Sequence, residues 1–259
     1  MAILNLTPDS FYDGGSYKNM NQVLKKVEQF LVEGADILDI GAYSSRPGAV
    51  HISEFEESNR LIPVLKEVKK EFPEISISID TFRSTIAKAC IEEGAHIIND
   101  ISGGTMDENI YQVVAKYQVP YVLTHMQGTP QNMQSQLIEG DIVAHIHQFF
   151  KNKIDFLAKI SVNNVILDVG FGFGKSIEQN FELLRHLETF NIYKKPILVG
   201  LSRKSMLYKP LKTTPDQSLN ATSIAHTLAI LNGANILRVH DVREANEVIE
   251  ILKKYRQMN

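Results

Sequence analysis

Short runs of Ile, Val and Leu alternate along this 259-residue chain with longer stretches in which apolar residues recur every three or four positions. The short runs are typical of buried parallel strands and the longer stretches of amphipathic helices. The runs predict eight strands, at 2–6, 37–40, 75–80, 97–101, 121–125, 165–169, 197–201 and 236–240. The stretches between them predict eight helices, at 19–33, 53–72, 84–93, 109–117, 141–159, 177–190, 218–232 and 242–257.

Eight strand–helix pairs in a chain of this length predict an α/β fold of the (β/α)8 TIM-barrel type. No Pro-, Gly- or Ser-rich linker and no shift in composition divides the chain, so we expect residues 1–259 to form a single domain. A doubly wound open sheet is the alternative, but it does not account for polar residues at nearly every strand end. In a barrel, that end carries the active site.

Three segments repeat one phrase, namely "EGADILDIGA" from Glu33, "EGAHIINDIS" from Glu93 and "NGANILRVHD" from Asn232. Each begins with a Gly where a helix should stop, followed by a small residue and an apolar run. Aligned on Gly-Ala, the three phrases place Asp39, Asn99 and Arg238 at one position. Because strand side chains alternate between two faces, these three should point to the same face of the sheet.

Polar residues cluster at the expected carboxyl ends of the strands. An unpartnered buried polar group costs several kcal/mol, so one such residue is usually a satisfied structural group, and that is the simpler interpretation of Asp39 or His125 taken singly. Polar groups at all eight strand ends indicate an active site instead. The residues are Asn5, Asp39, Asp80, Asn99, Asp100, His125, Asp168, Ser202, Arg203, Lys204, Arg238 and His240.

Composition limits the partners and the compartment. The formal charge of −3 and the absence of a long basic run give no reason to expect nucleic acid or an anionic membrane surface as a partner. The single cysteine, Cys90, lies among apolar residues and is interpreted as an inert core thiol in a reducing compartment. No apolar run is long enough for a membrane span, and no secretory signal opens the chain. We therefore expect a cytoplasmic protein.

The donor and acceptor types at the strand ends indicate a split site. Carboxylates only accept hydrogen bonds, lysine only donates them, and an amide does both. Two acids, one amide and one lysine suit the amino-amide edge of a flat heterocycle; these are Asp80, Asp168, Asn99 and Lys204. Donors for an anion such as phosphate stand beside them, namely Arg46, Arg203, Arg238 and His240. Arg203 is equally well interpreted as a solvated surface residue.

The glycine-rich segment "DVGFGFGKS", from Asp168 to Ser176, lacks the spacing of a phosphate-binding loop. Its glycines more simply allow the backbone to approach a flat ligand, with Phe173 alongside. Lys204 could alternatively form a Schiff base, as in barrel aldolases.

Eight segments, in order, resemble the dihydropteroate synthase family over essentially the whole chain. They are "ILNLTPDSFYDGG", "DIGAYSSRPGA", "SIDTFR", "NDISGG", "HMQGTP", "DVGFGFGKS", "GLSRKSM" and "LRVHD". The resemblance implies condensation of 6-hydroxymethyl-7,8-dihydropterin diphosphate with 4-aminobenzoate, giving 7,8-dihydropteroate and pyrophosphate. It also implies a homodimer formed through helices near the C-terminus.

The resemblance assigns roles residue by residue. The implied pterin pocket consists of Asp80, Asn99, Asp168, Lys204, Gly172 and Phe173. The implied diphosphate site consists of Asn5, Arg46, Arg238 and His240, with Asn5 directed toward Mg²⁺. The implied aminobenzoate pocket consists of Ser45, Arg46, Pro47, Phe173 and Ser202, and the implied catalytic groups are Asn5, Lys204, Arg238 and His240. The loop 7–10 resembles the first mobile loop of the family, which closes over the site.

Two positions depart from the family pattern. The family commonly has Glu-Ser-Thr where this chain has Tyr43-Ser44-Ser45, which changes the implied aminobenzoate pocket and with it the affinity for sulfonamides. It usually has Pro where this chain has Val169, which restores an N–H after Asp168.

Two pterin-related alternatives share the barrel. A pterin-dependent methyltransferase module would not need the Arg46-Pro47-Gly48 loop or the Arg238/His240 pair. A non-catalytic homologue would be expected to lose Asn5, Lys204 or His240.

Overall fold

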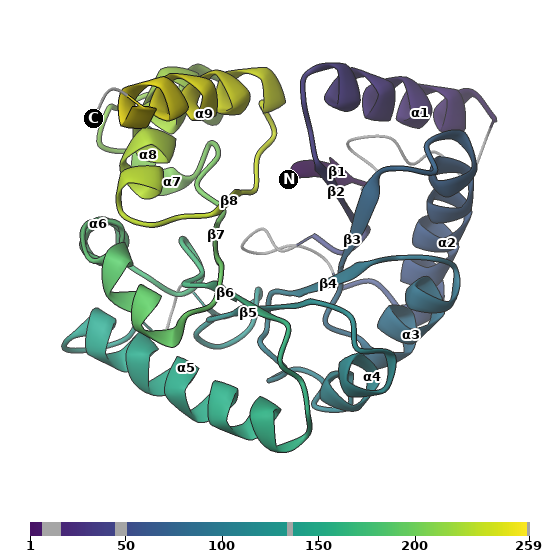
Figure 1. Cartoon of the computed structure of the whole chain (residues 1–259), viewed down its shortest axis with the longest axis horizontal. Helices are drawn as coiled ribbons and strands as arrows, with labels where there is room; N and C mark the ends of the chain where they lie inside the picture. The colour runs from purple at the N-terminus through teal and green to yellow at the C-terminus, as the bar shows by residue number, and fades with distance from the viewer. Residues whose placement is uncertain (7–16, 45–50, 134–136, 258–259) are drawn as a thin grey trace.

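The computed structural model describes residues 1–6, 17–44, 51–133 and 137–257. Its strands form one curled parallel sheet in chain order, encircled by helices (Figure 1). The strands are β1 (Ala2–Asn5), β2 (Ile37–Gly41), β3 (Ser76–Asp80), β4 (Ile97–Asp100), β5 (Tyr121–Thr124), β6 (Val165–Asp168), β7 (Ile197–Val199) and β8 (Ile236–Leu237). All eight predicted strands are confirmed, and the arrangement is consistent with a (β/α)8 barrel.

The segment that follows β8 meets β1. Arg238 N donates to Val199 O of β7 at 2.9 Å, and one residue later Val239 N donates to Met1 O at 2.9 Å. Ile3 N returns a bond of 2.9 Å to Val239 O, and Ala2 and Val239 form a parallel bridge. The predicted strand 236–240 therefore stays extended beyond β8, but its backbone partner changes from β7 to β1.

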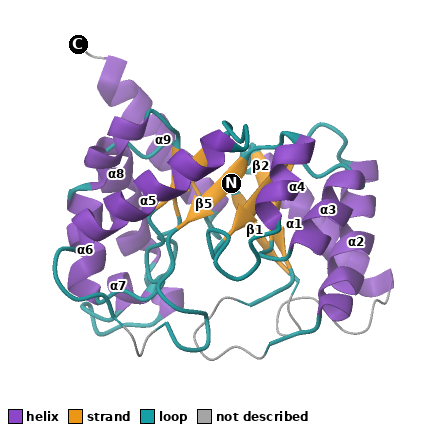
Figure 2. Ribbon diagram, turned by 90° about the horizontal axis from the view of Figure 1, so that it is seen from below, coloured by secondary structure: helices purple, strands orange, loops and turns teal. Residues whose placement is uncertain are grey.

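Helices follow the strands and cover the outside of the sheet (Figure 2). They are α1 (Tyr17–Val32), α2 (Glu54–Glu71), α3 (Ser84–Glu92), α4 (Ile110–Tyr117), α5 (Ile142–Lys159), α6 (Ile177–Arg185), α7 (Ser205–Tyr208), α8 (Leu219–Leu231) and α9 (Val242–Gln257). The predicted helix 177–190 is divided into α6 and the 3₁₀ helix η1 (Leu187–Tyr193). The short α7 and the 3₁₀ helix η2 (Pro215–Gln217) were not predicted, because elements of three or four residues show no periodicity. None of the helices in the described ranges combines the length and the hydropathy needed to cross a bilayer.

The repeated Gly-Ala phrase has the predicted conformation. Gly34, Gly94 and Gly233 follow the ends of α1, α3 and α8 with φ of +93°, +97° and +97°. A residue with a Cβ is strained in this left-handed region, so glycine lets each helix stop and the chain turn into the next strand.

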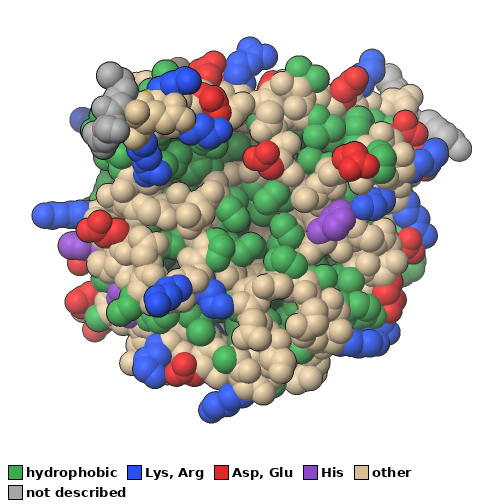
Figure 3. Space-filling view, in the orientation of Figure 1, with side chains coloured by type: hydrophobic (Ala, Val, Ile, Leu, Met, Phe, Trp, Pro, Cys, Tyr) green, Lys and Arg blue, Asp and Glu red, His purple; other side chains and the backbone are tan. Residues whose placement is uncertain are grey.

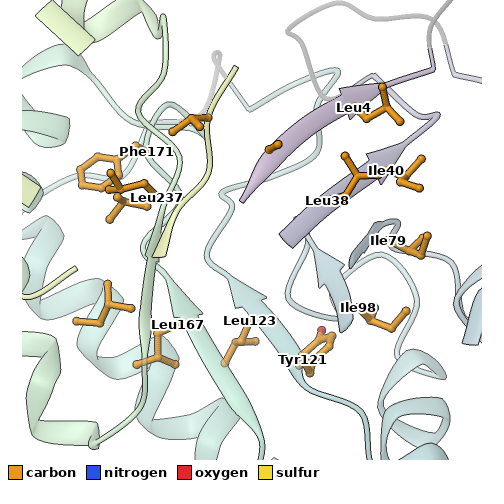
Figure 4. Packing of buried hydrophobic residues seen from close by; sticks show 14 of the residues in the cluster. Leu4, Leu38, Ile40, Ile79, Ile98, Tyr121, Leu123, Leu167, Phe171 and Leu237 are labelled. Carbon is orange, nitrogen blue, oxygen red and sulfur yellow. The ribbon is translucent and has the colours of Figure 1, made fainter. Parts of the chain in front are cut away.

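The two faces of the sheet carry different side chains. On the outer face, residues such as Leu38, Ile40 and Leu123 are buried in the main core against the helices (Figure 4). The inner face carries a smaller cluster built on Ile97, Val122, Ile166 and Leu198, with Met1, Ile37 and Ile236 partly buried against it. Figure 3 shows hydrophobic side chains gathered at the centre of one face of the molecule.

The period of two then places polar groups above this inner cluster. Two residues beyond Ile37, Ile97, Ile166 and Ile236 come Asp39, Asn99, Asp168 and Arg238, respectively. Along each of these strands, the inner face therefore changes from apolar near the start to polar near the end. This change places the candidate site at the carboxyl ends of the strands.

Candidate active site

A guanidinium joined to two carboxylates lies at the centre of the site. Arg238 donates through Nε to Asp39 Oδ2 at 2.6 Å and through a terminal nitrogen to Asp80 Oδ2 at 2.5 Å. Asn99 Nδ2 donates to the same oxygen of Asp39 at 3.1 Å. The predicted convergence of Asp39, Asn99 and Arg238 on one face is confirmed, although these residues lie up to 199 positions apart in sequence.

Asp39 lies within the candidate site, although taken singly it was interpreted as a satisfied structural group. Its side chain is completely buried, and its Oδ1 has no hydrogen-bond partner among the described residues. It fixes the orientation of the Arg238 guanidinium and of the Asn99 amide, so it is more than the satisfied structural group suggested for it singly. Its position in the repeated phrase, shared with Asn99 and Arg238, was the available signal.

The buried charges shift one another's pKa. Burial raises the pKa of the Asp80 carboxyl to about 7, although Arg238 opposes the shift, and the nearby Asp39 adds to it. Burial alone would lower the pKa of Arg238, but Asp39 and Asp80 outweigh it and raise that pKa above its ordinary value. The guanidinium therefore carries a permanent positive charge at the base of the site.

The end of β6 carries a second acid. Asp168 is buried, and its Oδ1 accepts a hydrogen bond from Gly170 N at 2.8 Å. Burial raises the pKa of Asp168, and the Lys204 ammonium partly reverses that shift. The Asp168 carboxylate thus lies within electrostatic reach of Lys204 and Arg238, as expected for the predicted heterocycle pocket.

Lys204, just after β7, extends over the glycine-rich turn. Its Nζ donates to Phe171 O and lies 4.5 Å from the centroid of the Phe173 ring. Burial lowers the pKa of Lys204 to about 8, against the opposing effect of Asp168. Gly172 has φ of +81°, and a Cβ there would lie 3.3 Å from Lys204 Cδ, so glycine leaves room for the lysine chain.

Asp80, Asn99, Asp168 and Lys204 therefore present two acids, an amide and an ammonium at strand ends of one sheet, as predicted. Gly172 and Phe173 adjoin Lys204. Two carboxylates that accept hydrogen bonds, one amide that both donates and accepts, and one ammonium that donates can together bind the amino-amide edge of a flat heterocycle. The phenyl ring of Phe173 supplies an apolar surface beside it.

Three of the residues predicted to bind the diphosphate, Asn5, Arg238 and His240, lie at or shortly after the ends of β1 and β8. His240, shortly after β8, is exposed, and its Nδ1 lies 3.2 Å from Ser202 Oγ. Asn5 is the last residue of β1, the strand that meets the segment after β8 through the Ala2–Val239 bridge. Arg238 uses two of its N–H groups on Asp39 and Asp80, and a guanidinium has five. Donors therefore remain for a bound anion.

Arg203 is bound to two carboxylates of the chain itself, and its interpretation as an anion donor stays a prediction. It binds both carboxylate oxygens of Asp241, at 2.9 and 2.7 Å, and Asp216 at 3.2 Å. Its backbone N donates to Thr222 Oγ1 at 3.1 Å. Because Arg203 precedes Lys204 and Asp241 follows His240, this ion pair ties the ends of the seventh and eighth strands together.

Two further strand-end polar residues are structural. Asp100 accepts four hydrogen bonds, from Ser102 N and Oγ, Gly104 N and Tyr121 Oη, each at 2.7 or 2.8 Å. His125 packs edge-on against the rings of His145 and Phe149. Burial lowers the pKa of His125 to about 2, so it stays neutral and takes no part in the charged site.

Several predicted residues lie outside the described ranges, namely Ser45, Arg46, Pro47 and the loop 7–10. Just before them, Tyr43 is buried, with its hydroxyl 3.1 Å from His51 Nδ1 and accepting from Gln131 Nε2 at 2.8 Å. The Tyr43 ring packs edge-on against Phe82. This tyrosine, which departs from the family pattern, thus contacts segments that follow β3 and β5.

The described residues contain no group of three or more His, Cys, Asp or Glu that could hold a metal ion. Asn5 offers one amide oxygen. Mg²⁺ commonly binds through one or two protein oxygens together with substrate phosphates and waters. The available donors fit that mode of binding rather than a cage built entirely from protein.

Comparison with known proteins gives a consistent result. A family model described as "Pterin binding enzyme" matches residues 1–240. The chain is 39% identical to a dihydropteroate synthase of Synechocystis, over 97% of this chain and 88% of the relative. A crystal structure of Yersinia pestis dihydropteroate synthase in a sulfonamide drug complex matches with a TM-score of 0.92 and 38% identity, covering 99% of this chain and 93% of that one. Dihydropteroate synthase from Xanthomonas albilineans, in complex with 7,8-dihydropteroate, matches with a TM-score of 0.88 and 31% identity, covering 100% and 93%.

Proposed function

The chain belongs to the family of pterin-binding enzymes, and we propose that it catalyses the dihydropteroate synthase reaction of folate synthesis. In this transferase reaction, 6-hydroxymethyl-7,8-dihydropterin diphosphate and 4-aminobenzoate give 7,8-dihydropteroate and pyrophosphate. The observation that carries the proposal is the set Asp80, Asn99, Asp168 and Lys204, gathered at the strand ends around Arg238. The proposed enzyme is a single domain, 1–259, with a closed (β/α)8 barrel.

The pterin binds by its polar edge. The carboxylates of Asp80 and Asp168 accept from the amino and ring N–H groups, and Lys204 donates to the carbonyl or a ring nitrogen. Lys204 exchanges its bond to Phe171 O for one to the pterin. Gly172 and Phe173 form one wall of the pocket.

The diphosphate binds next to the pterin, at Asn5, Arg46, Arg238 and His240. The Arg238 guanidinium is held in place by Asp39 and Asp80 before the substrate arrives, so binding costs little reorganisation. Asn5 would hold Mg²⁺ together with substrate oxygens, and the ion would supply charge neutralisation for the diphosphate.

The reaction is a substitution at the methylene carbon of the pterin substrate. The bond from this carbon to the bridging oxygen breaks, and its electron pair leaves with pyrophosphate. The neutral arylamine forms the new C–N bond and then loses a proton. Arg238 and His240 stabilise the leaving anion, while Asp80 and Asp168 stabilise positive charge that spreads into the pterin. No covalent enzyme intermediate is needed.

The aminobenzoate pocket is proposed at Ser45, Arg46 and Pro47 together with Phe173 and Ser202. Ser202 Oγ, beside His240 Nδ1, borders the diphosphate site, so it can help to align the arylamine with the breaking bond. Positioning of this kind is the main requirement, because the leaving group is already good.

A homodimer is part of the proposal and is supported by an apolar stripe on α8. Ile224, Leu228 and Leu231 lie at helical spacing on one face and are 55%, 44% and 47% exposed. Large apolar side chains exposed side by side are typical of interfaces. We also place the enzyme in the cytoplasm, since its single cysteine suits a reducing compartment.

The direct test is release of pyrophosphate from the purified protein with pterin diphosphate, 4-aminobenzoate and Mg²⁺. We expect release only when both substrates and the metal are present. Binding of pterin without release would favour a non-catalytic homologue. Release that does not depend on aminobenzoate would indicate hydrolysis and contradict the synthase reaction.

A further inference from the structure

Lys175, the lysine of the glycine-rich segment, is used in neither pocket. Its side chain is buried, with an exposed fraction of 4%. Its Nζ donates to three backbone carbonyl oxygens, those of His125 at 3.2 Å, Gly170 at 2.8 Å and Phe173 at 3.0 Å. An ammonium group has three N–H donors, so these contacts use all of them.

These contacts distinguish Lys175 from a phosphate-binding lysine. In a phosphate-binding loop, backbone N–H groups and the lysine face the anion. In this protein, the Lys175 ammonium instead donates to carbonyl oxygens of the turn, those of Gly170 and Phe173. Lys175 therefore binds the turn itself, and no donor remains for a substrate phosphate.

The turn is pressed tightly against the segment that follows β5. Gly170 has φ of +69°, and a Cβ there would lie 1.9 Å from His125 O. Gly174 has φ of +65°, and a Cβ there would lie 2.6 Å from Gln127 Cβ. The carbonyl oxygens of His125, Gly170 and Phe173 converge on one point, where only a cation or several donors can offset their repulsion.

Two of the residues bound by Lys175 also contact residues of the proposed pterin pocket. Gly170, whose carbonyl binds Lys175, donates its N–H to Asp168 Oδ1 at 2.8 Å. Phe173, whose carbonyl also binds Lys175, places its ring 4.5 Å from the Lys204 ammonium. Lys175 thus fixes both ends of the turn whose middle residue, Phe171, accepts the bond from Lys204.

We infer that Lys175 is a positioning residue of the pterin pocket, holding the turn 170–173 against the end of β5 so that Asp168, Phe173 and Lys204 face the pterin. The inference rests on the proposed function. Burial lowers the pKa of Lys175 to about 7; Asp168 opposes this shift and Lys204 adds to it.

The test compares Lys175→Met with Lys195→Met. Methionine keeps an apolar chain of similar length but removes all three donors. Lys195 also donates to a backbone carbonyl, Asn163 O at 2.7 Å, but near the start of β7, so it is a matched control. We expect Lys175→Met to raise KM for pterin diphosphate about tenfold and KM for aminobenzoate by a smaller factor, because Phe173 borders both pockets. Lys195→Met should keep all kinetic constants.

A lower Tm of Lys175→Met with unchanged KM for pterin diphosphate would show a purely structural role and overturn the inference. An equal rise of both KM values would overturn it as well. If wild type itself releases no pyrophosphate, the proposed function has failed; the inference is then still tested by the affinity of each variant for the dihydropterin ring.

A second measurement uses the unmodified protein and does not depend on the variant folding. Lysines are acetylated and located by mass spectrometry, with and without pyrophosphate. We expect Lys175 to resist labelling in both samples, while the exposed Lys194 reacts in both. Labelling of Lys175 that pyrophosphate suppresses would show a phosphate-binding lysine and overturn the inference.

Discussion

Replacing Asp168 by Asn tests whether its carboxylate binds the pterin. The amide can keep one oxygen for Gly170 N, which now donates to Asp168 Oδ1 at 2.8 Å. The other oxygen becomes an NH₂ group, so a pterin N–H meets a donor instead of an acceptor. Asp168 also stabilises the charged form of Lys204, and this support is lost in the variant.

The magnitude follows from the burial of the site. A hydrogen bond to a charged group contributes about 1.5–3 kcal/mol, and the opposed donors place the loss at the upper end of that range. A loss of about 3 kcal/mol weakens the affinity for the pterin ring roughly 150-fold. The change should appear in Kd for the dihydropterin, measured by titration calorimetry without the second substrate.

Asp107→Asn is the matched control. Asp107 accepts backbone hydrogen bonds from Ser84 at 2.7 Å and Asn109 at 3.1 Å, and it is not among the residues assigned to the pterin pocket. This variant should lose some stability but keep the Kd of wild type. A wild-type Kd in Asp168→Asn would refute the assigned role of the carboxylate.

Three other predictions concern the diphosphate site, the charge of Lys204 and the proposed dimer interface. His240→Ala should slow turnover while the Kd for the bare pterin ring stays unchanged; weaker ring binding, seen by calorimetry, would mean that the two pockets are not separate. Because the pKa of Lys204 is lowered to about 8 and its ammonium form donates a stronger hydrogen bond to the pterin than the neutral amine, the affinity should fall as pH rises through about 8. The variant Lys204→Arg stays charged, so its Kd for the pterin should not rise as the pH increases through about 8. If Kd still rises in this variant, another group is responsible for the pH dependence. Leu228→Glu should convert a dimer to a monomer in light scattering, whereas a wild-type monomer would contradict the proposed interface.

Much of the fold could be read from local patterns. The Gly-Ala phrase predicted helix ends and strand starts, because a left-handed stop needs glycine and buried parallel strands need apolar runs. The same phrase predicted that Asp39, Asn99 and Arg238 share a face. The segment after β8 was harder to predict, since the change of its backbone partner from β7 to β1 depends on contacts between the two ends of the chain.

The partners of charged side chains could not be read from the sequence. Arg203 and Arg238 both follow apolar runs, yet one binds Asp241 at the edge of the site and the other binds Asp39 and Asp80 within it. The partners of Lys175 could not be predicted either. Its three acceptors are backbone carbonyl oxygens, which every residue type has, so no side chain in the sequence marks them. Contacts of this kind depend on how distant segments pack.

The central claim, carbon–nitrogen bond formation with loss of pyrophosphate, is tested most directly by following one labelled oxygen. Pterin diphosphate carrying a heavy oxygen between its methylene carbon and the diphosphate is incubated with the protein, 4-aminobenzoate and Mg²⁺, and the products are analysed by mass spectrometry. The account predicts heavy pyrophosphate and an equal amount of unlabelled 7,8-dihydropteroate. Heavy hydroxymethyl-dihydropterin, formed without dihydropteroate, would show cleavage at phosphorus and contradict it.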